Sequence, residues 1–510
     1  MAMDLSSRVT PLNDCAENTK GRYVMYWMQM FKRASHNYAL NFAIELANER
    51  GVPLLVYEGL KYNYPWASDR IHTFILEGVA EKHLEFERRG IRYAFYLQRN
   101  SRDPRNTVAR LAKDAALLVT DDYPCFIIPE HNQRVAELKL PVFAVDANGM
   151  LPMAAFQKEE YAAYTLRPKL NRMLPDAPRR IVTPRLKVAD IDIEINCPET
   201  EFTDENIPAL VSECEIDHSV RPSKLYRGGP KAGRQRLKYF VEHILPDYDS
   251  TRNEPSVDGS SRLSPYLHFG FLSIQEVVEA VEKSPAPQSA KAAFLEEAIV
   301  RRELSFNLTR HNPNYDSLDA LPPWAQKTMR DHESDPRPEL LEAKTIEAAE
   351  TYDELWNAAQ RELVNTGLLH NYVRMLWGKR VIEWQRSYEM AFELLVHLNN
   401  KYALDGRDPN SYAGILWCFG KHDRPWPERE IFGTMRYMSS KSMSRKFRAK
   451  KYIEWTHNSL ECAALSALSP AAARRRDVAV VVSTSTLSKV EQHCDKSQRT
   501  KAPTRRTPRS

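Results

Sequence analysis

"YVMYWM", residues 23–28, is a short run of apolar and aromatic residues of the kind that forms a buried β-strand. Four similar runs follow before residue 150, and a segment with helical periodicity separates most of them. Short apolar strands that alternate with helices predict an α/β domain with a doubly wound parallel sheet, here over residues 21–190. The later runs are VPLLVYEG (52–59), IRYAFYL (91–97), ALLVTD (116–121) and PVFAVDA (141–147).

The rest of the chain has a different pattern. Residues 191–230 include a strongly acidic stretch and are interpreted as a linker. From residue 231 to 458 long helical segments follow without strands, which predicts an all-α domain. We expect both ends of the chain, residues 1–20 and 459–510, to be disordered, and the second of them is rich in Ser, Thr, Ala and Arg.

Composition narrows the class of protein. With 510 residues and 43% apolar content, the chain can bury a large core. No apolar run approaches the roughly 18 residues of a membrane span, and no signal peptide is evident, so we expect an intracellular protein, cytoplasmic or nuclear. The seven cysteines lack metal-ligand spacing, which predicts reduced thiols and no metal site. Residues 474–510 alone carry a charge of +7, whereas the whole chain carries +5, so the residues before 474 have no excess of positive charge. Any nucleic-acid site in that part must therefore be recognised from local clusters of Lys and Arg.

Two glycine- or serine-rich segments are candidates for phosphate binding. Residues 248–270, YDSTRNEPSVDGSSRLSPYLHFG, place hydroxyls and backbone N–H groups just before a helix, which suits a phosphate as well as an ordinary capped loop. GGPKAGRQ, residues 228–235, lacks the Lys and the Ser/Thr of a P-loop. No G-x-G-x-x-G follows a strand, so a Rossmann dinucleotide site is disfavoured as well.

Glu297 lies in FLEEAIVRREL, residues 294–304, one helical turn before Arg301. A surface ion pair between positions i and i+4 is the ordinary explanation of such a pair. The alternative is a buried carboxyl whose pKa is raised, so that it can donate a hydrogen bond to a substrate. Both interpretations remain open from the sequence alone.

Two further segments have unusual side chains. GLLHNYVRMLWGKRVIEW, residues 367–384, predicts a helix of about five turns with Arg374, Trp377 and Trp384 on one face. A buried stripe explains these tryptophans as well as a path for electrons does. Between residues 429 and 451, eight Lys/Arg and one acid are interleaved with aromatic and hydroxyl residues, which favours contact with a phosphate backbone over a solvated helix face.

Taken in order, four segments resemble the DNA photolyases, specifically the class II cyclobutane pyrimidine dimer type, over residues 22–456. The resemblance implies a helical FAD-binding domain and a carbon–carbon lyase, in which photoexcited reduced FAD passes an electron to a flipped-out pyrimidine dimer in DNA. It also allows an antenna chromophore of unknown identity in the α/β domain. The segments are FLEEAIVRREL, LHNYVRMLW (369–377), DGRDPNSY (405–412) and GKHDRPWPEREIFGTMRYM (420–438).

Carried over residue by residue, the resemblance implies two groups of FAD contacts. One loop would hold the phosphates and the ribityl chain. Around the isoalloxazine, Arg374 and Asp405 would form an ion pair, and Asn399 would face the N5 atom. The residues of the loop group are Tyr248, Ser260, Ser261, Arg262, Leu263 and Ser264.

The resemblance also implies contacts with the damaged DNA. Glu297 would hydrogen-bond the dimer, Met375 would pack under it, and Trp417 would form a stacking wall. A tryptophan relay would photoreduce the flavin, and a set of cations would hold the DNA backbone without reading its sequence. The relay consists of Trp356, Trp377 and Trp384, and the cations are Arg301, Arg429, Arg436, Arg445 and Lys446.

Asn371 departs from the class II pattern, in which Gly takes this place. Because it lies one turn before Met375, we expect it to reach the dimer or to displace water from the pocket. A cryptochrome-like flavin photoreceptor without repair activity is the alternative, and it would need the flavin and the relay but no dimer pocket. Repair of (6-4) photoproducts is disfavoured, because Asn371 and not a second histidine follows His370. The resemblance therefore implies a monomeric enzyme whose partner is UV-damaged DNA.

Overall fold

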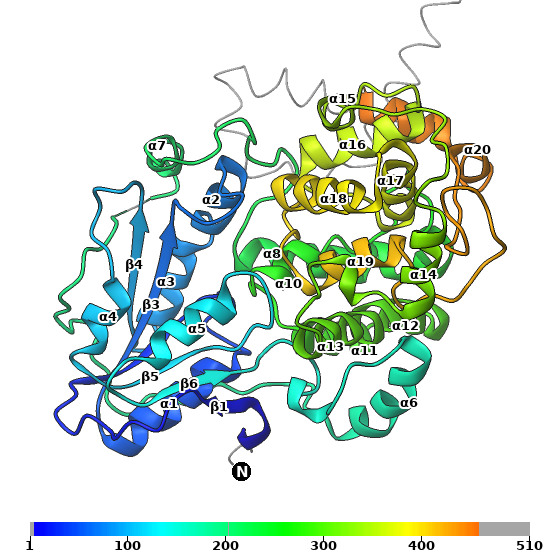
Figure 1. The fold of residues 1–510 in the computed structure, drawn as a ribbon. Helices are drawn as coiled ribbons and strands as arrows, with labels where there is room; N and C mark the ends of the chain where they lie inside the picture. Colours follow the sequence, from blue (N-terminus) through cyan, green and yellow to red (C-terminus); the bar gives the residue numbers. More distant parts are fainter. Residues whose placement is uncertain (1–4, 202, 458–510) are drawn as a thin grey trace, which may run out of the picture. The chain divides into compact units, whose positions relative to one another are not determined.

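The computed structural model describes residues 5–201 and 203–457, with a six-stranded sheet followed by a helical region (Figure 1). The strand order is β1-β6-β5-β2-β3-β4, in which β1 is antiparallel to β6 and the other neighbours are parallel. The strands are β1 (Val9–Pro11), β2 (Tyr23–Trp27), β3 (Leu54–Lys61), β4 (Arg92–Gln98), β5 (Ala115–Asp121) and β6 (Val142–Val145).

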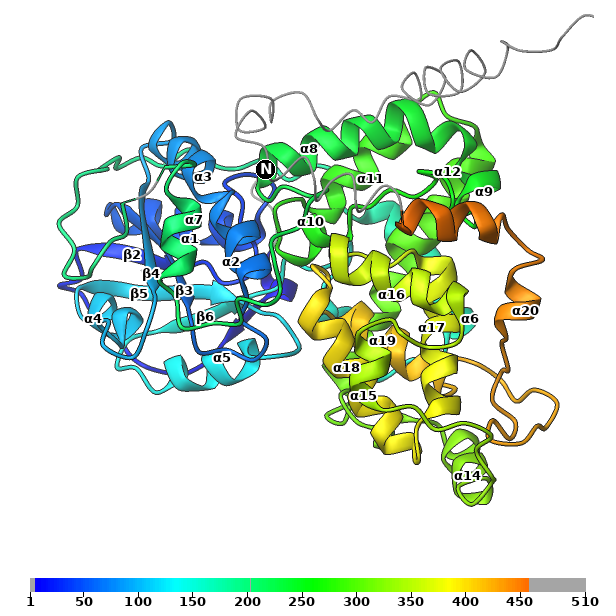
Figure 2. The same ribbon diagram turned by 90° about the horizontal axis from the view of Figure 1, so that it is seen from above.

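Helices cover both faces of this sheet. Val24 of β2 packs into a core with the first three helices, whereas its neighbour Met25 packs on the opposite face with the next two. In Figure 2, α1 and α3 lie on one side of the strands and α5 lies on the other. The predicted doubly wound α/β fold is thus confirmed, and the strands are continuously apolar because both faces are buried. The helices are α1 (Tyr38–Arg50), α2 (Asp69–Leu76), α3 (Val79–Glu87), α4 (Thr107–Ala112) and α5 (Ile128–Ala136).

The prediction that residues 1–20 are disordered is wrong from Leu5 onward. Strand β1 pairs with β6 at the edge of the sheet. Buried Arg8 donates hydrogen bonds to the carbonyls of Asp146 and Met150, at 3.2 and 2.9 Å. A three-residue edge strand is too short to show periodicity, which is why the sequence did not reveal it. The predicted disordered stretch 459–510 lies outside the described residues.

The segment after β6 does not stay with the sheet. Helix α6 (Ala163–Met173) lies within the predicted α/β domain, yet its Leu166 packs with Ile274 and Ile299 of the helical region. Ile181 and Leu186 then return to the core beside α1. Residues 191–230, interpreted as a linker, carry helix α7 (Ile207–Ser212) and bury Ile207 against the same α/β core.

In the described part of the helical region there are thirteen labelled α-helices and two π-helical turns, and residues 449–457 are helical as well (Figure 1). No helix in residues 5–201 or 203–457 has the length and apolarity needed to cross a bilayer. The helices are α8 (Pro230–Tyr239), α9 (Tyr248–Thr251), α10 (Ser264–His268), α11 (Ile274–Lys283), α12 (Gln288–Leu295), α13 (Arg302–His311), α14 (Pro323–Asp331), α15 (Ala343–Glu347), α16 (Glu354–Thr366), α17 (Asn371–Trp384), α18 (Tyr388–Tyr402), α19 (Pro409–Cys418) and α20 (Ser440–Met443), and the π-helical turns are η4 (Phe240–Ile244) and η6 (Glu296–Arg301).

Arg70 joins the α/β domain to the helical region. From α2 its guanidinium donates hydrogen bonds to the carbonyls of Leu363 and Val364 in α16, at 3.4 and 2.6 Å. A third bond, of 2.7 Å, reaches the carbonyl of Tyr402 at the end of α18. These helices carry the candidate site, so the α/β domain fixes their ends.

Candidate functional site

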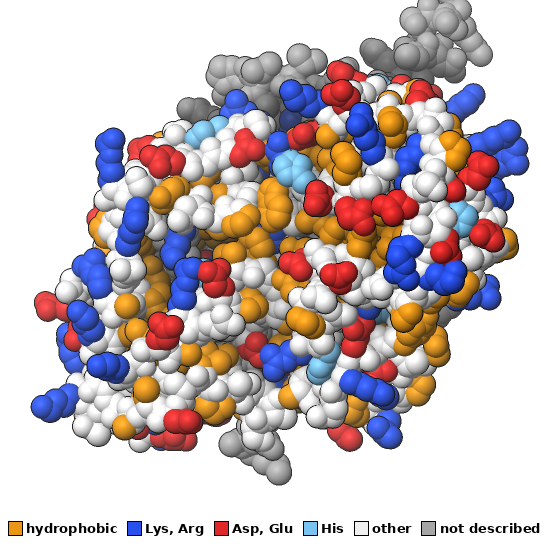
Figure 3. Space-filling model, in the orientation of Figure 1, with side chains coloured by type: hydrophobic (Ala, Val, Ile, Leu, Met, Phe, Trp, Pro, Cys, Tyr) orange, Lys and Arg blue, Asp and Glu red, His pale blue; other side chains and the backbone are white. Residues whose placement is uncertain are grey.

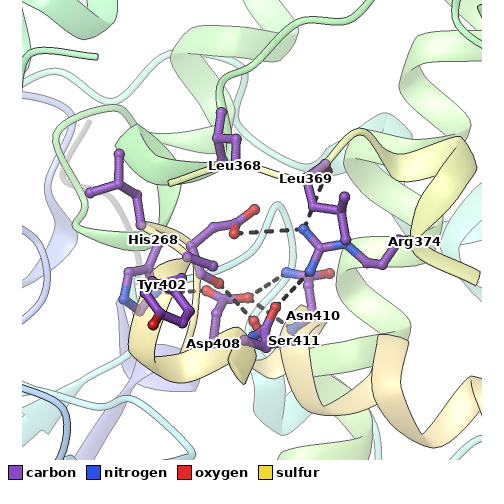
Figure 4. Close-up of polar contacts among 12 residues, drawn as sticks. His268, Leu368, Leu369, Arg374, Tyr402, Asp408, Asn410 and Ser411 are labelled. Carbon is purple, nitrogen blue, oxygen red and sulfur yellow. Dashed lines mark hydrogen bonds and ion pairs between the residues drawn. The ribbon is translucent and has the colours of Figure 1, made fainter. Parts of the chain in front are cut away.

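Arg374 is the centre of a polar cluster between α17, α18 and α19 (Figure 4). Its Nη1 donates a hydrogen bond of 2.8 Å to Oδ1 of Asn399, and its Nη2 donates one of 3.5 Å to the carbonyl of Leu369. Nη2 also lies 3.8 Å from Oδ1 of Asp405, so the predicted ion pair is present. Oδ1 of Asp405 is buried, yet it accepts no hydrogen bond from a described residue. The cluster therefore holds a carboxylate oxygen that is ready to accept a hydrogen bond from a ligand.

Unfilled space adjoins this cluster at Gly414 of α19. A Cβ atom on Gly414 would meet nothing nearer than Cδ of Arg374, at 4.0 Å. Gly378 of α17 is the opposite case, because a Cβ atom there would lie 2.5 Å from Sγ of Cys418. Gly378 thus permits the close packing of α17 on α19, whereas Gly414 leaves room beside the guanidinium.

Asp408 fixes the start of α19. Its Oδ1 accepts hydrogen bonds of 2.8 and 2.7 Å from the backbone and the side-chain amide of Asn410. Its Oδ2 accepts one of 2.7 Å from the Tyr123 hydroxyl, in the α/β domain, and lies 3.1 Å from Nδ1 of His268. Burial alone would raise the pKa of Asp408, but the His268 side chain and these donors hold it well below its usual range.

Tyr123 and His268 were not among the predicted site residues. The signals for them were present, because Tyr123 lies two residues after a strand of the parallel sheet and His268 lies within the predicted phosphate segment 248–270. What the sequence could not show is that both side chains meet the same carboxylate, far away in the chain.

Arg262 adopts a left-handed backbone conformation, with φ of 54°, in the predicted phosphate loop. Its guanidinium is 2.8 Å from Oδ1 of Asp258 and donates a hydrogen bond of 2.6 Å to the Tyr226 hydroxyl. Arg236 donates two bonds of 2.8 Å to the carbonyls of Ser260 and Ser261. The two arginines therefore shape the loop itself.

The side chains of the same loop are left available. The hydroxyls of Ser260, Ser261 and Ser264 make no hydrogen bond with a described residue, whereas Leu263 is buried. Tyr248 lies apart from them, with its ring 5.5 Å from that of Phe294 between centroids, and burial raises its pKa to about 12. Within residues 260–264, three serine hydroxyls are thus available to a ligand, whereas Arg262 and Leu263 are engaged in the protein.

Glu297 pairs with Arg252, at 3.1 Å, and not with Arg301. Both sequence interpretations of this residue need correction. Residues 296–301 form a π-helical turn, which has more residues per turn than an α-helix and so brings positions i and i+5 together; Arg301 accordingly lies 3.6 Å from Glu296. The Glu297 side chain is 36% exposed, so it is not a buried carboxyl either. It is a solvent-accessible carboxylate on an irregular turn.

The other predicted dimer contacts lie on α17 and α19. Trp417 is partly exposed, with the guanidinium carbon of Arg301 5.0 Å from its ring. Sδ of Met375 is 3.8 Å from Sγ of Cys418, the residue after Trp417. Asn371 is exposed at the first position of α17. Arg301 thus links Trp417 to the turn that carries Glu297. Among the described residues, Trp417, Met375 and Asn371 form no hydrogen bond with Glu297.

The three predicted relay tryptophans are brought together in the core. Trp356 of α16 lies edge-on to Trp384, with ring centroids 5.1 Å apart. The Trp356 indole also donates a hydrogen bond of 2.9 Å to the carbonyl of Trp377. Their relative exposures are 0%, 2% and 1% for Trp356, Trp377 and Trp384. Trp377 follows Arg374 by one turn of α17, so the indoles lead away from the polar cluster.

Four of the five predicted DNA-binding cations lie around α20 and the segment before it, whereas Arg301 lies on the π-helical turn and pairs with Glu296. Arg436 is stacked on Trp426 and Arg429 on Tyr437, at 5.0 and 4.8 Å from ring centroid to guanidinium carbon. Arg445 and Lys446 are exposed, and none of these four cations forms an ion pair with a described residue. The face shown in Figure 3 mixes charges of both signs, so the positive side chains form local clusters and not a uniform field.

Known proteins identify the family. The deoxyribodipyrimidine photo-lyase of Methanothermobacter thermautotrophicus is 39% identical over 454 residues, covering 88% of this chain and 98% of its own. The chain belongs to the deoxyribodipyrimidine photo-lyase family. The photolyases of Arabidopsis thaliana and Potorous tridactylus are 36% and 35% identical, each covering 85% of this chain and 88% and 81% of their own. No family model matches.

Solved photolyase and cryptochrome structures share the fold. A class III photolyase from Agrobacterium tumefaciens has a TM-score of 0.63 at 18% identity, covering 87% of this chain and 90% of its own. The cryptochrome of Synechocystis has a TM-score of 0.64 at 16% identity, covering 85% and 88%. The photolyase of Sulfolobus tokodaii, solved with two FAD molecules, has a TM-score of 0.60 at 16% identity, covering 87% and 94%. At these identities the comparison establishes the architecture alone.

The residues around Arg374 fit the FAD of a photolyase. Oδ1 of Asp405 is a buried acceptor to which no described residue donates a hydrogen bond, and the space at Gly414 adjoins a cation and an amide on α17 and α18. A flat heteroaromatic ring with polar edges needs an open space that is bordered by a few fixed polar groups. The hydroxyls of Ser260, Ser261 and Ser264, which make no hydrogen bond with any described residue, add donors of the kind that phosphates require.

Proposed function

We propose that this photolyase is of the class II type and uses light to split cyclobutane pyrimidine dimers in DNA. The observation that carries the proposal is the Arg374, Asp405 and Asn399 cluster beside the space at Gly414, within a photo-lyase chain. When bound, FAD in its reduced form supplies the light-absorbing electron donor that one-electron cleavage of the cyclobutane ring requires. The protein residues would bind and orient the cofactor and supply charged groups beside it.

Arg374 and Asp405 are proposed to hold the polar edge of the isoalloxazine, with Asn399 near its N5 atom. Arg374 already has two further acceptors, at 2.8 and 3.5 Å, so its guanidinium has a fixed orientation before a ligand arrives. A fixed cation next to the isoalloxazine stabilises negative charge on the ring, and the reduced flavin carries such a charge. Residues 260–264 would carry the phosphates and the ribityl chain, with Tyr248 at the edge of this group.

The dimer would bind where α17, α19 and the π-helical turn meet. Glu297 is proposed to accept a hydrogen bond from the damaged bases, with Met375 and Trp417 as apolar walls. Supporting this, Glu297 is accessible and Trp417 is partly exposed, so both can reach a ligand that arrives from solvent. Asn371, exposed at the start of α17, is proposed to contact the dimer from the side. Extrusion of the dimer is needed because its reactive bonds lie inside the duplex.

Arg301 and the cations of residues 429–446 are proposed to bind the DNA backbone. Arg429 and Arg436 are held by stacking on aromatic rings and have no described anionic partner. Such cations gain affinity by displacing counterions from phosphates, so binding will weaken steeply with salt. We propose UV-damaged DNA as the partner, a monomer as the acting form, and an intracellular location, which the free thiols of the described cysteines support.

Trp356, Trp377 and Trp384 are proposed to return the flavin to its reduced state after accidental oxidation. An antenna chromophore also remains a proposal. A cavity of about 390 Å³ lies at the edge of the α/β domain, and its lining includes Thr10, Asn132 and Arg310. An absorption spectrum of the purified protein would reveal the band of such a chromophore beside that of the flavin.

One assay tests the proposed function. The purified protein is chemically reduced, mixed with an oligonucleotide that contains one thymine dimer, and illuminated, and recovery of thymine absorbance is followed. We expect recovery in the light and none in the dark. If a flavin-loaded protein restored no more thymine absorbance in the light than in the dark, repair would be refuted. The photoreceptor alternative would then remain, because it needs only the flavin and the tryptophans.

A further inference from the structure

Tyr352 extends the line of tryptophans to the protein surface. It precedes α16, and its ring is 5.8 Å from that of Trp384 between centroids, edge-on at 71°. The Trp384 indole N–H donates a hydrogen bond of 2.9 Å to the Tyr352 hydroxyl oxygen. Helices α16 and α17 lie side by side (Figures 1 and 2), and the contact lies between α17 and the segment that leads into α16. Trp384 and Tyr352 are thus joined both by ring contact and by a hydrogen bond.

Exposure changes sharply along this line. Trp384 is 1% exposed, whereas Tyr352 is 55% exposed. An oxidised indole is a cation until it loses its N–H proton, and the Trp384 N–H points at a hydroxyl oxygen, which is a poor base. Positive charge on Trp384 therefore has no direct route to water. Tyr352 is in contact with water, so it can release a proton when it is oxidised.

The hydrogen bonds of Tyr352 leave its own proton free to depart. Its oxygen accepts a second hydrogen bond, of 2.8 Å, from Nη2 of Arg380. With both lone pairs occupied by donors, the phenolic O–H has to point toward solvent. The guanidinium also lies over both rings, with its central carbon 5.6 Å from the Tyr352 centroid and 4.8 Å from that of Trp384.

Two carboxylates offset the charge of Arg380. Oδ2 of Asp353 accepts a hydrogen bond of 3.1 Å from Nε of Arg380, and Oε2 of Glu383 accepts one from its Nη1. Asp353 also caps α16 by accepting a hydrogen bond of 3.1 Å from the backbone N–H of Trp356. The positive charge beside the phenol is thus balanced, and Arg380 acts as a positioning residue that orients the Tyr352 oxygen toward Trp384.

We infer that Tyr352 is the terminal electron donor of the relay and carries the oxidised site from the buried tryptophans to the surface. The inference rests on the proposed relay. If the tryptophans gave up one electron to the bound, light-excited flavin, a radical cation would be left at Trp384. One electron then passes from Tyr352 to Trp384, the phenolic O–H bond breaks, and its proton goes to water. Trp384 returns to its neutral form, and Tyr352 becomes a neutral phenoxyl radical.

Loss of the proton makes the charge separation long-lived, because return of the electron would require the proton to be recaptured from solvent. The exposed radical can then take a hydrogen atom from a soluble thiol, which restores the phenol and forms a thiyl radical. Without Tyr352, the radical cation would stay at buried Trp384 and recombine. Tyr352 is therefore expected to set the yield of flavin reduction.

Flash spectroscopy of the oxidised flavoprotein tests this inference. In the unmodified protein we expect the broad visible band of a tryptophanyl radical to give way to the sharp near-ultraviolet band of a tyrosyl radical. Tyr352→Phe should lose the tyrosyl band and shorten the radical lifetime. Tyr164→Phe is the matched control, because Tyr164 is similarly exposed, at 65%, and lies on α6, which is not part of the relay; it should retain the band.

Ring-deuterated tyrosine gives a second readout in the unmodified protein, because it narrows the electron paramagnetic resonance spectrum of a tyrosyl radical only. A tyrosyl band that persists in Tyr352→Phe, or a tryptophanyl radical that remains the last carrier in the unmodified protein, would overturn the inference. Repair by chemically reduced protein does not need the relay. Repair without a tyrosyl radical therefore refutes this inference alone, and a tyrosyl radical without repair refutes the proposed function alone.

Discussion

Glu297 illustrates how an irregular turn presents a side chain. In a regular helix Arg301 would cover it, but the π-helical turn gives Arg301 to Glu296 and leaves Glu297 with Arg252 at the surface. The extra residue in such a turn rotates the following side chains relative to the preceding ones. Glu297 can therefore exchange its arginine partner for a ligand without exposing a buried charge.

Replacing Glu297 by Gln should lower dimer repair and leave FAD bound. A hydrogen bond to a charged group contributes about 1.5–3 kcal/mol, so the repair rate at limiting substrate should fall by roughly tenfold to a hundredfold. Repair yield per absorbed photon and flavin content are measured together. Glu282→Gln is a matched control, because Glu282 pairs with Arg179 at the same distance of 3.1 Å and is 39% exposed, compared with 36%. Equal repair by both variants would exclude Glu297 from the dimer site.

Replacing Asp408 by Ala should destabilise the protein by about 2–4 kcal/mol. The substitution removes the N-cap of α19 and leaves the buried Tyr123 hydroxyl and His268 without their shared acceptor. Urea unfolding followed by circular dichroism measures the free energy. Ser273→Ala, which removes only the N-cap of α11, should cost about 1 kcal/mol. If both variants lose the same free energy, the link between Asp408 and the α/β domain contributes nothing.

Two glycines determine how closely helices α17 and α19 approach each other along their length. Gly378 lets Cys418 approach, and Gly414 keeps a space open beside Arg374. The pair explains how two packed helices can also form one wall of a binding site. Close contact at Gly378 fixes the two helices relative to each other, and the missing side chain at Gly414 leaves room for a ligand.

Replacing Gly414 by Leu should abolish FAD binding while the protein stays folded. The new side chain would fill the space that we assign to the flavin, and helix propensity favours Leu over Gly by up to about 1 kcal/mol. Flavin absorbance after purification and the unfolding midpoint of the flavin-free protein are compared. Gly378→Ala should show the converse, a loss of stability through contact with Cys418. Full flavin occupancy in Gly414→Leu would place the cofactor elsewhere.

The sequence revealed the elements that have strong local signals. The strands of the sheet were evident because burial on both faces makes them continuously apolar, and the tryptophans of α17 were evident from their spacing. Edge strand β1 and the π-helical turn were missed, because one is too short for periodicity and the other differs from an α-helix by a single residue. Contacts between distant segments, such as Tyr123 with Asp408, are set by tertiary packing and have no local signal.

For the whole molecule, buried histidines should make stability fall in mild acid. Burial lowers the pKa of His72, His370 and His422 to about 4. Between that value and about 6.5 the unfolded chain binds protons that the folded chain cannot bind, so stability is lost as pH falls. Each histidine accounts for on the order of 3 kcal/mol. His370 also needs its neutral form, because its Nδ1 accepts the hydrogen bond that caps α17.

Glu303 works in the opposite direction over part of this range. Burial raises its pKa to about 7, so its contribution is present at low pH and is lost as pH rises toward 7. Three histidines outweigh one glutamate, and the unfolding free energy should drop between about pH 6.5 and about pH 4.5. Urea unfolding at several pH values measures the drop. His370→Asn, which retains a capping side chain but cannot titrate, should make the curve shallower; an unchanged slope would contradict the assignment.

Arg70 has a consequence for the way such a protein can be rearranged by recombination. Its guanidinium donates hydrogen bonds to backbone carbonyls at the C-termini of α16 and α18, where the helix dipoles are negative. A chain that exchanged its α/β half for an unrelated one would leave both helix ends open, next to the cluster around Arg374. The two halves are therefore expected to be inherited together, and a swap between relatives should succeed only where the donor half supplies an arginine at this place in α2.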